Sequence, residues 1–530
     1  MIHRFLPFGR IALACGAATA MLALSGCDLA PNYEQPKFVV PDSWHGQAPF
    51  ARATPADTVM PMDWWTLFND PLLTSLEAKL TASNPDLQAS AERFIQARAM
   101  VVKARSELLP HLALAAGASD NKQSADRLFR YKGETTATDE SYGGLASWEP
   151  DFWSAIRNHV RAQKQYAQEK AADFALSRLS LQAELASDYV ELRGYDAQIA
   201  IYEQSIGYYE KALKITQNQL ANQAAPRLDV ARAQTQLYNT QAAKLDVEAA
   251  RAVTEHAIAV LTNTAPSGFH IASQSRMLSA QPAIPTGIPS ELLQRRPDIA
   301  ASEREMAQAN REIGIARAAF YPHISLNVGG GFAQNGFDLA NLANSLWTYG
   351  ASFELPLFEG GLRRAELQRS WSGYRETRDT YRSKVLNAFR EVEDGLSRTD
   401  RLNLENNTLE KAVRATLDTQ NMTMTLYQGG VGTYLDALFS QVQTLDTRIH
   451  QVEVATRLFQ ADVGLIRALG GGWNVHLMPT MDQTLSIEPL QYSDLHHPAP
   501  VGGVTISQDP ATFENLRATN APGGPVTPSP

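Results

Sequence analysis

Two segments in the second half of the chain alternate large apolar residues with small or polar ones. Residues 324–328 alternate Ile, Leu and Val with Ser and Asn, and residues 347–355 alternate aromatic and aliphatic residues with Thr, Gly, Ser and Glu. This period of two predicts β-strands with one apolar face. Residues 112–114 and 142–148 repeat the pattern more faintly in the first half. The sequence therefore predicts four strands, two in each half.

The rest of each half is predicted to be helical. A helix of about 25 residues starts near Pro85 or Pro297 and ends at the proline before His111 or His323, because proline cannot continue a helix. No proline interrupts residues 151–225 or 357–478, and a helix of about 65 residues would be about 100 Å long. Many positions that would face a core at helical spacing carry alanine or polar residues. This favours a wall of closely packed helices with one face exposed to water. A plain long coiled coil is the alternative.

The two halves are copies of one unit. Residues 84–117 align without a gap on residues 296–329, an offset of 212 positions (296 less 84), and about a dozen of the aligned pairs are identical. A weaker match relates Leu228 and Asp229 to Leu435 and Asp436. Length alone would suggest three or four domains of about 150 residues. The repeat predicts one duplicated protomer instead.

Composition narrows the function classes. The chain has 530 residues, of which 44% are hydrophobic, and a net charge of −9. This apolar content excludes a wholly disordered chain and a polytopic helical membrane protein, and the acidic balance excludes nucleic acid as the main partner. Two cysteines, Cys15 and Cys27, cannot build a disulfide framework or a cysteine-based metal site.

The N-terminus has the features of an export signal. Arg4 and Arg10 precede an uncharged run at 11–24 that is too short to span a bilayer as a helix, and LSGC follows at 24–27. This ending resembles the lipobox of bacterial lipoproteins, which implies that residues 1–26 are removed and that Cys27 is acylated. The alternative is an ordinary signal peptide with an incidental cysteine. Asp28 resembles an inner-membrane retention signal of some enteric bacteria, so the anchor alone does not decide which membrane holds the protein.

No motif indicates catalysis. The sequence lacks HExxH, P-loop and GxSxG patterns, and its eleven histidines are scattered. Gly429, Gly430 and Gly432 lack the Lys-Ser/Thr pair of a phosphate loop and lie between helical runs, so they predict a tight turn between two helices. We therefore expect a protein that is not an enzyme and has no cofactor and no metal site.

Four strands cannot close a barrel in lipid, because open edges leave backbone groups unpaired and barrels need at least about eight strands. Two arrangements satisfy this constraint. One is a soluble four-stranded sheet whose aromatic face is covered by a helix. The other is a barrel assembled from several chains, with twelve strands from three copies.

Residues 29–475 resemble TolC-like outer-membrane efflux proteins, nearest the NodT-type lipoprotein channels of resistance–nodulation–division (RND) efflux systems. The segments that carry the resemblance, besides Cys27, are PNYEQP (31–36), DWWTLFNDPL (63–72), SWEPDF (147–152), RRPDI (295–299), ARAAFYP (316–322), LPLFEGG (355–361) and YQGGVGTYLD (427–436).

The resemblance implies a mainly α-helical protomer with a small transmembrane β part. Long helical hairpins would form an α-barrel, and four strands per chain would contribute to a twelve-strand β-barrel in a homotrimer. It also implies an outer-membrane location, a periplasmic membrane-fusion adaptor and an inner-membrane RND pump as partners, and passive export of drugs or other small molecules. A channel for type I protein secretion and a lipid-anchored periplasmic coiled-coil scaffold are the alternatives.

The expected organisation has six parts: a signal peptide (1–26), a lipidated extended segment (27–62), a first repeat (63–270), a linker (271–290), a second repeat (291–475) and a largely disordered tail (476–530).

The turns between the long helices are the candidate functional sites. The resemblance implies that the turn at Gly429, Gly430 and Gly432 and its counterpart at Pro226 form the periplasmic entrance and contact the adaptor. Asp229 and Asp436 follow these turns, and a ring of three copies in a narrow pore would bind cations and form a gate. The alternative is that each aspartate caps the next helix. Other prominent residues are expected to be structural: Arg295, Arg296 and Asp298 at a helix start, and Trp64 and Trp65 in packing beside the helices.

Overall fold

The computed structural model describes residues 27–36, 38, 44, 60–122, 124, 136–224, 226–275, 277–278, 281–285, 289–334 and 341–479. The predicted signal peptide at 1–26 with Cys15, most of the segment at 37–59 and the tail from 480 onward lie outside these residues. Within the described part of the chain, no helix combines the length and apolar character needed to cross a membrane.

Eight α-helices and four strands make up the described fold. The helices are α2 (Pro71–Ser83), α3 (Pro85–Ser106), α4 (Ala155–Ala221), α5 (Arg227–Leu261), α6 (Pro289–Arg295), α7 (Pro297–Ala318), α8 (Leu362–Gln428) and α9 (Tyr434–Ala468). The strands are β1 (His111–Lys122), β2 (Thr136–Trp148), β3 (His323–Ala333) and β4 (Ser345–Glu354). A 3₁₀ helix, η1 (Trp64–Phe68), precedes α2.

The duplication predicted from the sequence is confirmed by matching helix lengths. Helices α3 and α7 both have 22 residues, α4 and α8 both have 67, and α5 and α9 both have 35. Positions in the long helices correspond at an offset of 207 residues (362 less 155, and 434 less 227). The backbone of the unit has therefore been kept through both long hairpins.

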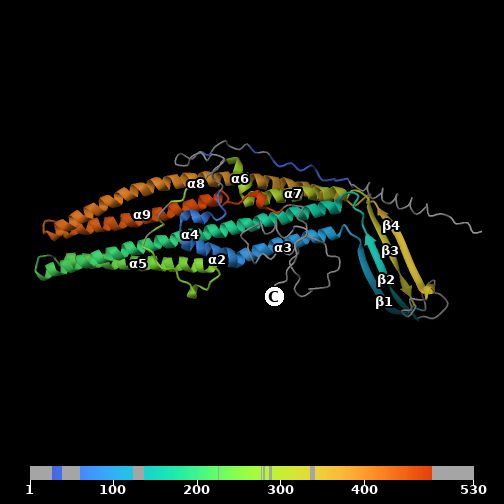
Figure 1. Cartoon of the computed structure of the whole chain (residues 1–530), viewed down its shortest axis with the longest axis horizontal. Helices are drawn as coiled ribbons and strands as arrows, with labels where there is room; N and C mark the ends of the chain where they lie inside the picture. The colour runs from blue at the N-terminus through green and yellow to red at the C-terminus, as the bar shows by residue number, and fades with distance from the viewer. Residues whose placement is uncertain are drawn as a thin grey trace, which may run out of the picture.

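The helices lie side by side in an elongated array with the sheet at one end and two helical turns at the other (Figure 1). In the half near the turns, α4 packs on α5 and α9, and α9 packs on α8, giving the order α5–α4–α9–α8. Nearer the sheet the order is α3–α4–α7–α8. The array is a single layer, so α5 and α8 form its two edges at the turn end.

Helix starts follow from the local sequence. The side chain of Asn84 accepts a hydrogen bond from the Leu87 amide at 2.9 Å, and Pro85 occupies the first helical position, where its missing N–H costs nothing. In the second repeat, Arg296 replaces this cap and donates to Asp298 at 2.7 Å and to Glu391 on α8 at 2.7 Å. The expected role of Arg296 and Asp298 at a helix start is confirmed.

The four strands form one antiparallel sheet in the order β1–β2–β3–β4. The register places Val328 opposite Tyr349 and Ala146, and Leu114 opposite Gly144, so one face collects the large apolar residues of all four strands. These side chains are exposed in the single chain, with Leu114 at 93% and Trp347 at 74%. The opposite face has mainly small and polar residues. Among the described residues, no helix covers the aromatic face, although the soluble-sheet alternative requires such a cover.

The two halves of the sheet meet at glycines. Gly143 of β2 lies opposite Gly331 of β3, and a Cβ on Gly143 would come within 2.5 Å of the Gly330 carbonyl oxygen. A Cβ on Gly331 would come within 2.2 Å of the Tyr142 carbonyl oxygen. Only glycine allows the strands this close approach.

The main hydrophobic core lies halfway along the helices. Trp64 is fully buried there, with Trp65 against its edge at a ring distance of 5.9 Å, which confirms their predicted packing role. Gly471, at φ +54°, approaches Leu179 so closely that a Cβ would lie 2.1 Å from its side chain. Residues 475–479, at the start of the expected tail, are ordered, and Met478 packs with Trp473 and Phe94.

Candidate functional site

The two helical turns lie together at the end of the molecule remote from the sheet (Figure 1). In the second repeat Gly430 has φ +73°, and the amides of Gly430 and Val431 donate to the carbonyls of Tyr427 and Leu426 at 3.1 and 3.0 Å. In the first repeat Gln223 holds the same left-handed conformation at φ +58°, with the equivalent bonds to Leu220 and Gln219. The two repeats therefore share the same turn geometry, although the first has Gln223 where the second has Gly430.

The helix starts after these turns differ. The Thr433 hydroxyl accepts from the Asp436 amide at 3.2 Å and donates to the Asp436 carboxylate at 2.6 Å, which caps α9. Pro226 makes no side-chain cap at the start of α5, and Asp229 instead lies 3.5 Å from Arg232. The cap of α9 is therefore Thr433, whose hydroxyl the Asp436 carboxylate holds in place, whereas Asp229 forms an ion pair with Arg232.

Tyrosines tie the two hairpins together at the tip. The Tyr427 hydroxyl of α8 donates to Gln219 of α4 at 2.7 Å, and its ring lies 5.7 Å from that of Tyr434. Burial, followed by the charge of Asp229, raises the pKa of Tyr427, and burial raises that of Tyr434 to about 12. Asp229 therefore lies near both tyrosines. This cluster was not predicted from the sequence, although a pair of tyrosines flanks the predicted turn.

Cys27 is exposed at the start of a docked segment. The carboxylate of the next residue, Asp28, accepts from the Asn158 side chain at 2.9 Å and pairs with Arg161 and with Arg311, the latter at 3.3 Å. Burial acts to raise the pKa of Asp28, but the hydrogen bonds from Asn158 and the Ala30 amide and the two arginine charges outweigh it and lower the pKa. Asp28 is thus held as a carboxylate between α4 and α7.

The residues after Asp28 continue along the same groove. Asn310 donates to the Pro31 carbonyl at 2.9 Å, and the Tyr33 hydroxyl donates to Glu303 at 2.5 Å. A Cβ on Gly314 would come within 2.8 Å of Ala30, so glycine makes room for the segment. These contacts place Cys27 beside the ends of α4 and α7 that lie nearer the sheet.

A buried ionic cluster fastens the first repeat to the linker. Asp196 pairs with Arg193 at 2.9 Å and with Arg251 at 2.7 Å, and both of its side-chain oxygens are inaccessible to solvent. Arg193 also donates to the Ala272 carbonyl at 2.9 Å, and Arg251 donates to the Ile271 carbonyl at 2.7 Å. In the second repeat, the described part of the linker makes a weaker contact, in which Gln281 lies 3.5 Å from Asp462.

Two carboxyl groups of the helical array have pKa values above the ordinary value of an aspartate. Burial raises the pKa of Asp462 to about 7. Burial, with the charges of Glu184 and Glu191 on the same helix, raises the pKa of Asp188 to about 6. Among the described residues, no three His, Cys, Asp or Glu side chains gather as a metal-binding group.

Comparison with known proteins gives consistent results over both repeats. The family model described as "Outer membrane efflux protein" matches residues 77–264 and 288–471, together more than half of the chain. Nodulation protein T of Rhizobium leguminosarum bv. trifolii is 29% identical over 464 residues, covering 86% of this chain and 96% of that protein. Outer membrane protein OprJ of Pseudomonas aeruginosa is 30% identical over 483 residues, covering 87% and 96%. The solved outer-membrane channel OprN has 26% identity and a TM-score of 0.76, covering 84% of this chain and 100% of that one.

Proposed function

The chain belongs to the outer membrane efflux protein family, and we propose that three copies of it close the channel through which cargo leaves the cell. It is an outer-membrane component of a tripartite efflux system and extends into the periplasm. Members of this family are channels rather than enzymes. The partners that follow from this role are a periplasmic membrane-fusion adaptor and an inner-membrane RND pump, with the channel itself a passive conduit for drugs or other small molecules.

The sheet is the observation that carries the proposal. It has one apolar face and one polar face, and among the residues that the structure describes the outer strands β1 and β4 each have an unpaired edge. In a bilayer such edges must be paired, and pairing β4 of one copy with β1 of the next in a ring of three gives a closed twelve-strand barrel. The apolar face would then contact lipid and the polar face would line the pore.

The edges of the helical array support the same closure. Leu386, Leu404 and Met422 on α8 are each more than half exposed and follow one another at 18 residues, which is five helical turns. On the other edge, Leu245, Val253 and Val260 of α5 are at least 62% exposed. Packing α8 of one copy against α5 of the next buries both stripes and continues the wall.

We further propose that residues 1–26 are cleaved and that Cys27 is acylated. The docked segment holds Cys27 towards the sheet end, where acyl chains reach the inner leaflet of the outer membrane. The Asp28 carboxylate, which resembles part of an inner-membrane retention signal, is bound by Arg161, Arg311 and Asn158 in the folded protein. This engagement supports an outer-membrane destination.

The tip is the proposed entrance. The turns at Pro226 and at Gly429, Gly430 and Gly432 would meet the adaptor, and Asp229 and Asp436 would ring the pore three times each. Asp436→Ala and Asp229→Ala test this separately, because Asp436 also accepts from the Thr433 hydroxyl that caps α9, whereas Asp229 pairs with Arg232. Unchanged conductance and cation selectivity in both variants would refute a gate at these positions.

Reconstitution of the purified full-length protein in planar bilayers tests the function. We expect heat-modifiable trimers with discrete conductance steps. Monomeric material without conductance would contradict the channel and favour a lipid-anchored scaffold. Drug susceptibility of a deletion strain separates small-molecule efflux from protein secretion, since only the former predicts sensitisation that the intact gene reverses.

A further inference from the structure

The two repeats differ in charge at one place midway along the array. Helix α4 presents Glu184, Asp188 and Glu191 on one face. The equivalent positions of α8, 207 residues later, are Glu391, Gly395 and Arg398. Helix α9 adds Arg457 and Arg467 where α5 has Ala250 and Val260.

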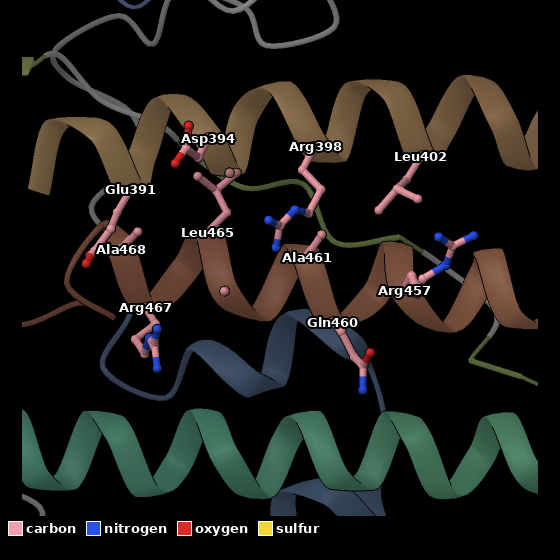
Figure 2. Close-up of a pocket in the computed structure, with 12 residues that line it drawn as sticks. Glu391, Asp394, Arg398, Leu402, Arg457, Gln460, Ala461, Leu465, Arg467 and Ala468 are labelled. Atoms are coloured by element: carbon pink, nitrogen blue, oxygen red, sulfur yellow. The ribbon is translucent and has the colours of Figure 1, made fainter. Parts of the chain in front are cut away.

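The second-repeat surface contains a hollow of about 510 Å³ between α8 and α9. It forms because small residues line its floor, among them Gly395, Ala461 and Gly464. Figure 2 shows Arg398 reaching from α8 towards α9 beside Ala461, with Arg457 on α9 near Leu402. The hollow thus has guanidinium groups from both helices.

The carboxylates around these arginines neutralise them only in part. Glu391 is engaged by Arg296 at 2.7 Å, which leaves Asp394 as the one other acidic residue of the lining. Arg457 lies 3.7 Å from Glu405, a loose ion pair. Within the described part of the chain, Arg398 and Arg467 form no ion pair. The hollow is therefore locally basic in an acidic protein.

The hollow lies on the side of the wall opposite the belt, which we define as η1, α2 and the described residues between 271 and 285. On α9 the belt contacts Phe459, whose ring lies 6.4 Å from that of Phe68, and Asp462. At 3.6 residues per turn, Arg457 and Gly464 project from the opposite side of α9. With the belt outside the closed tube, where it leaves the bore open for cargo, the hollow faces the lumen.

We propose that this hollow is a binding site for anionic groups of passing molecules, such as carboxylates, phosphates or sulfonates, repeated three times around the lumen. The inference rests on the proposed channel. Guanidinium groups bind such oxyanions through paired, charge-assisted hydrogen bonds. The three hollows alternate with three acidic patches from Glu184, Asp188 and Glu191, so an anionic group is held at the second-repeat positions and repelled at the first.

The test uses 1,3,5-benzenetricarboxylate as the probe with the detergent-solubilised full-length protein. Calorimetric titration should show binding to the unmodified protein, and Arg398→Gln or Arg457→Gln should lower the affinity about tenfold each. Arg401→Gln is the matched control, since Arg401 lies one turn further along α8 beside Asp400 and outside the lining. It should leave the affinity unchanged.

A bilayer measurement separates this inference from the proposed function. The probe should reduce the conductance of the unmodified channel but not that of the Arg398→Gln, Arg457→Gln double variant. If the channel conducts while the probe does not bind, or binds all variants equally, the anion site is refuted and the channel stands. If Arg401→Gln weakens binding as much as the lining variants, general electrostatic attraction explains the result and the site is again refuted. Loss of all conductance would instead count against the channel.

Discussion

The two repeats share a backbone but differ in the side chains that hold it. Their corresponding long helices have equal lengths. The first repeat fastens the linker through the buried Arg193–Asp196–Arg251 cluster, whereas the second has Asn403 where the first has Asp196. The first places Gln223 in the left-handed turn position, whereas the second places Gly430.

A tube of three chains contains six long hairpins, two from each chain. The contrast between the repeats shows which features all six hairpins share and which occur in only three of them. Helix length and turn geometry must match in all six hairpins, because neighbouring hairpins pack along their full length. Side chains at the linker and on the luminal face need not match, since each occurs once per chain. A tube of three copies therefore has approximate sixfold symmetry in its backbone but threefold symmetry in its side chains.

The largest difference between the repeats should come from the ionic cluster. Asp196→Ala leaves Arg193 and Arg251 without their shared carboxylate in a buried place, which should cost about 3–5 kcal/mol of stability. Asn403→Ala, at the equivalent position of α8, should change stability by less than about 0.5 kcal/mol. Thermal dissociation of the trimer, followed by gel mobility, measures both. Equal losses in the two variants would show that the repeats are held in the same way.

The junction between the halves of the sheet should be nearly as sensitive. Gly143→Ala forces a Cβ against the Gly330 carbonyl, which should cost about 1–3 kcal/mol and lower the yield of inserted trimer. The neighbouring Gly144→Ala meets nothing closer than 3.7 Å and serves as the control. Similar yields of heat-modifiable trimer from both variants would contradict the close approach of β2 and β3.

The turns should respond with opposite signs. Gly430→Ala places a Cβ in the left-handed region and should destabilise the second hairpin tip by about 1 kcal/mol. Gln223→Gly relieves the same strain in the first tip and should stabilise it, although the greater freedom of glycine in the unfolded chain reduces the gain. Amide hydrogen exchange at the two tips reports each change locally. Faster exchange in both variants would mean that Gln223 stabilises its turn.

The last expected effect is on pH dependence, where solvent screening of the partly exposed Asp188 reduces the stability change that its pKa shift implies. The pKa of Asp188 is raised to about 6 in the folded chain from an ordinary value near 3.8, so the folded state binds the extra proton between these values. Stability should therefore fall as the pH rises from about 4 to 6, and Asp188→Asn should reduce this slope and exceed the unmodified protein in stability at pH 7. The slope that remains is expected from Asp462, whose pKa is raised to about 7. Val463 is not titratable, so Val463→Ala controls for packing loss alone. A pH slope that is unchanged in Asp188→Asn would show that Asp188 does not contribute to it.

Much of the fold could be predicted from the sequence, because long uninterrupted helices and alternating strands leave periodic patterns. The repeat at 84–117 and 296–329 predicted the duplication, and Pro85 and Pro297 marked helix starts. The partners of Asp28 and the hollow between α8 and α9 could not be predicted. Asp28 contacts Asn158 and Arg311, which lie more than a hundred positions away, and the hollow brings together residues 391–402 of α8 and 457–468 of α9. No local pattern relates such residues. The left-handed Gln223 was missed because glycine is the usual signal for that conformation.

The central claim is that a single chain is an incomplete tube that three copies close. Native mass spectrometry of the protein extracted from the outer membrane in mild detergent tests this most directly. The account predicts one assembly with three times the mass of the lipidated chain. A monomer, a dimer or a tetramer under the same conditions would contradict it.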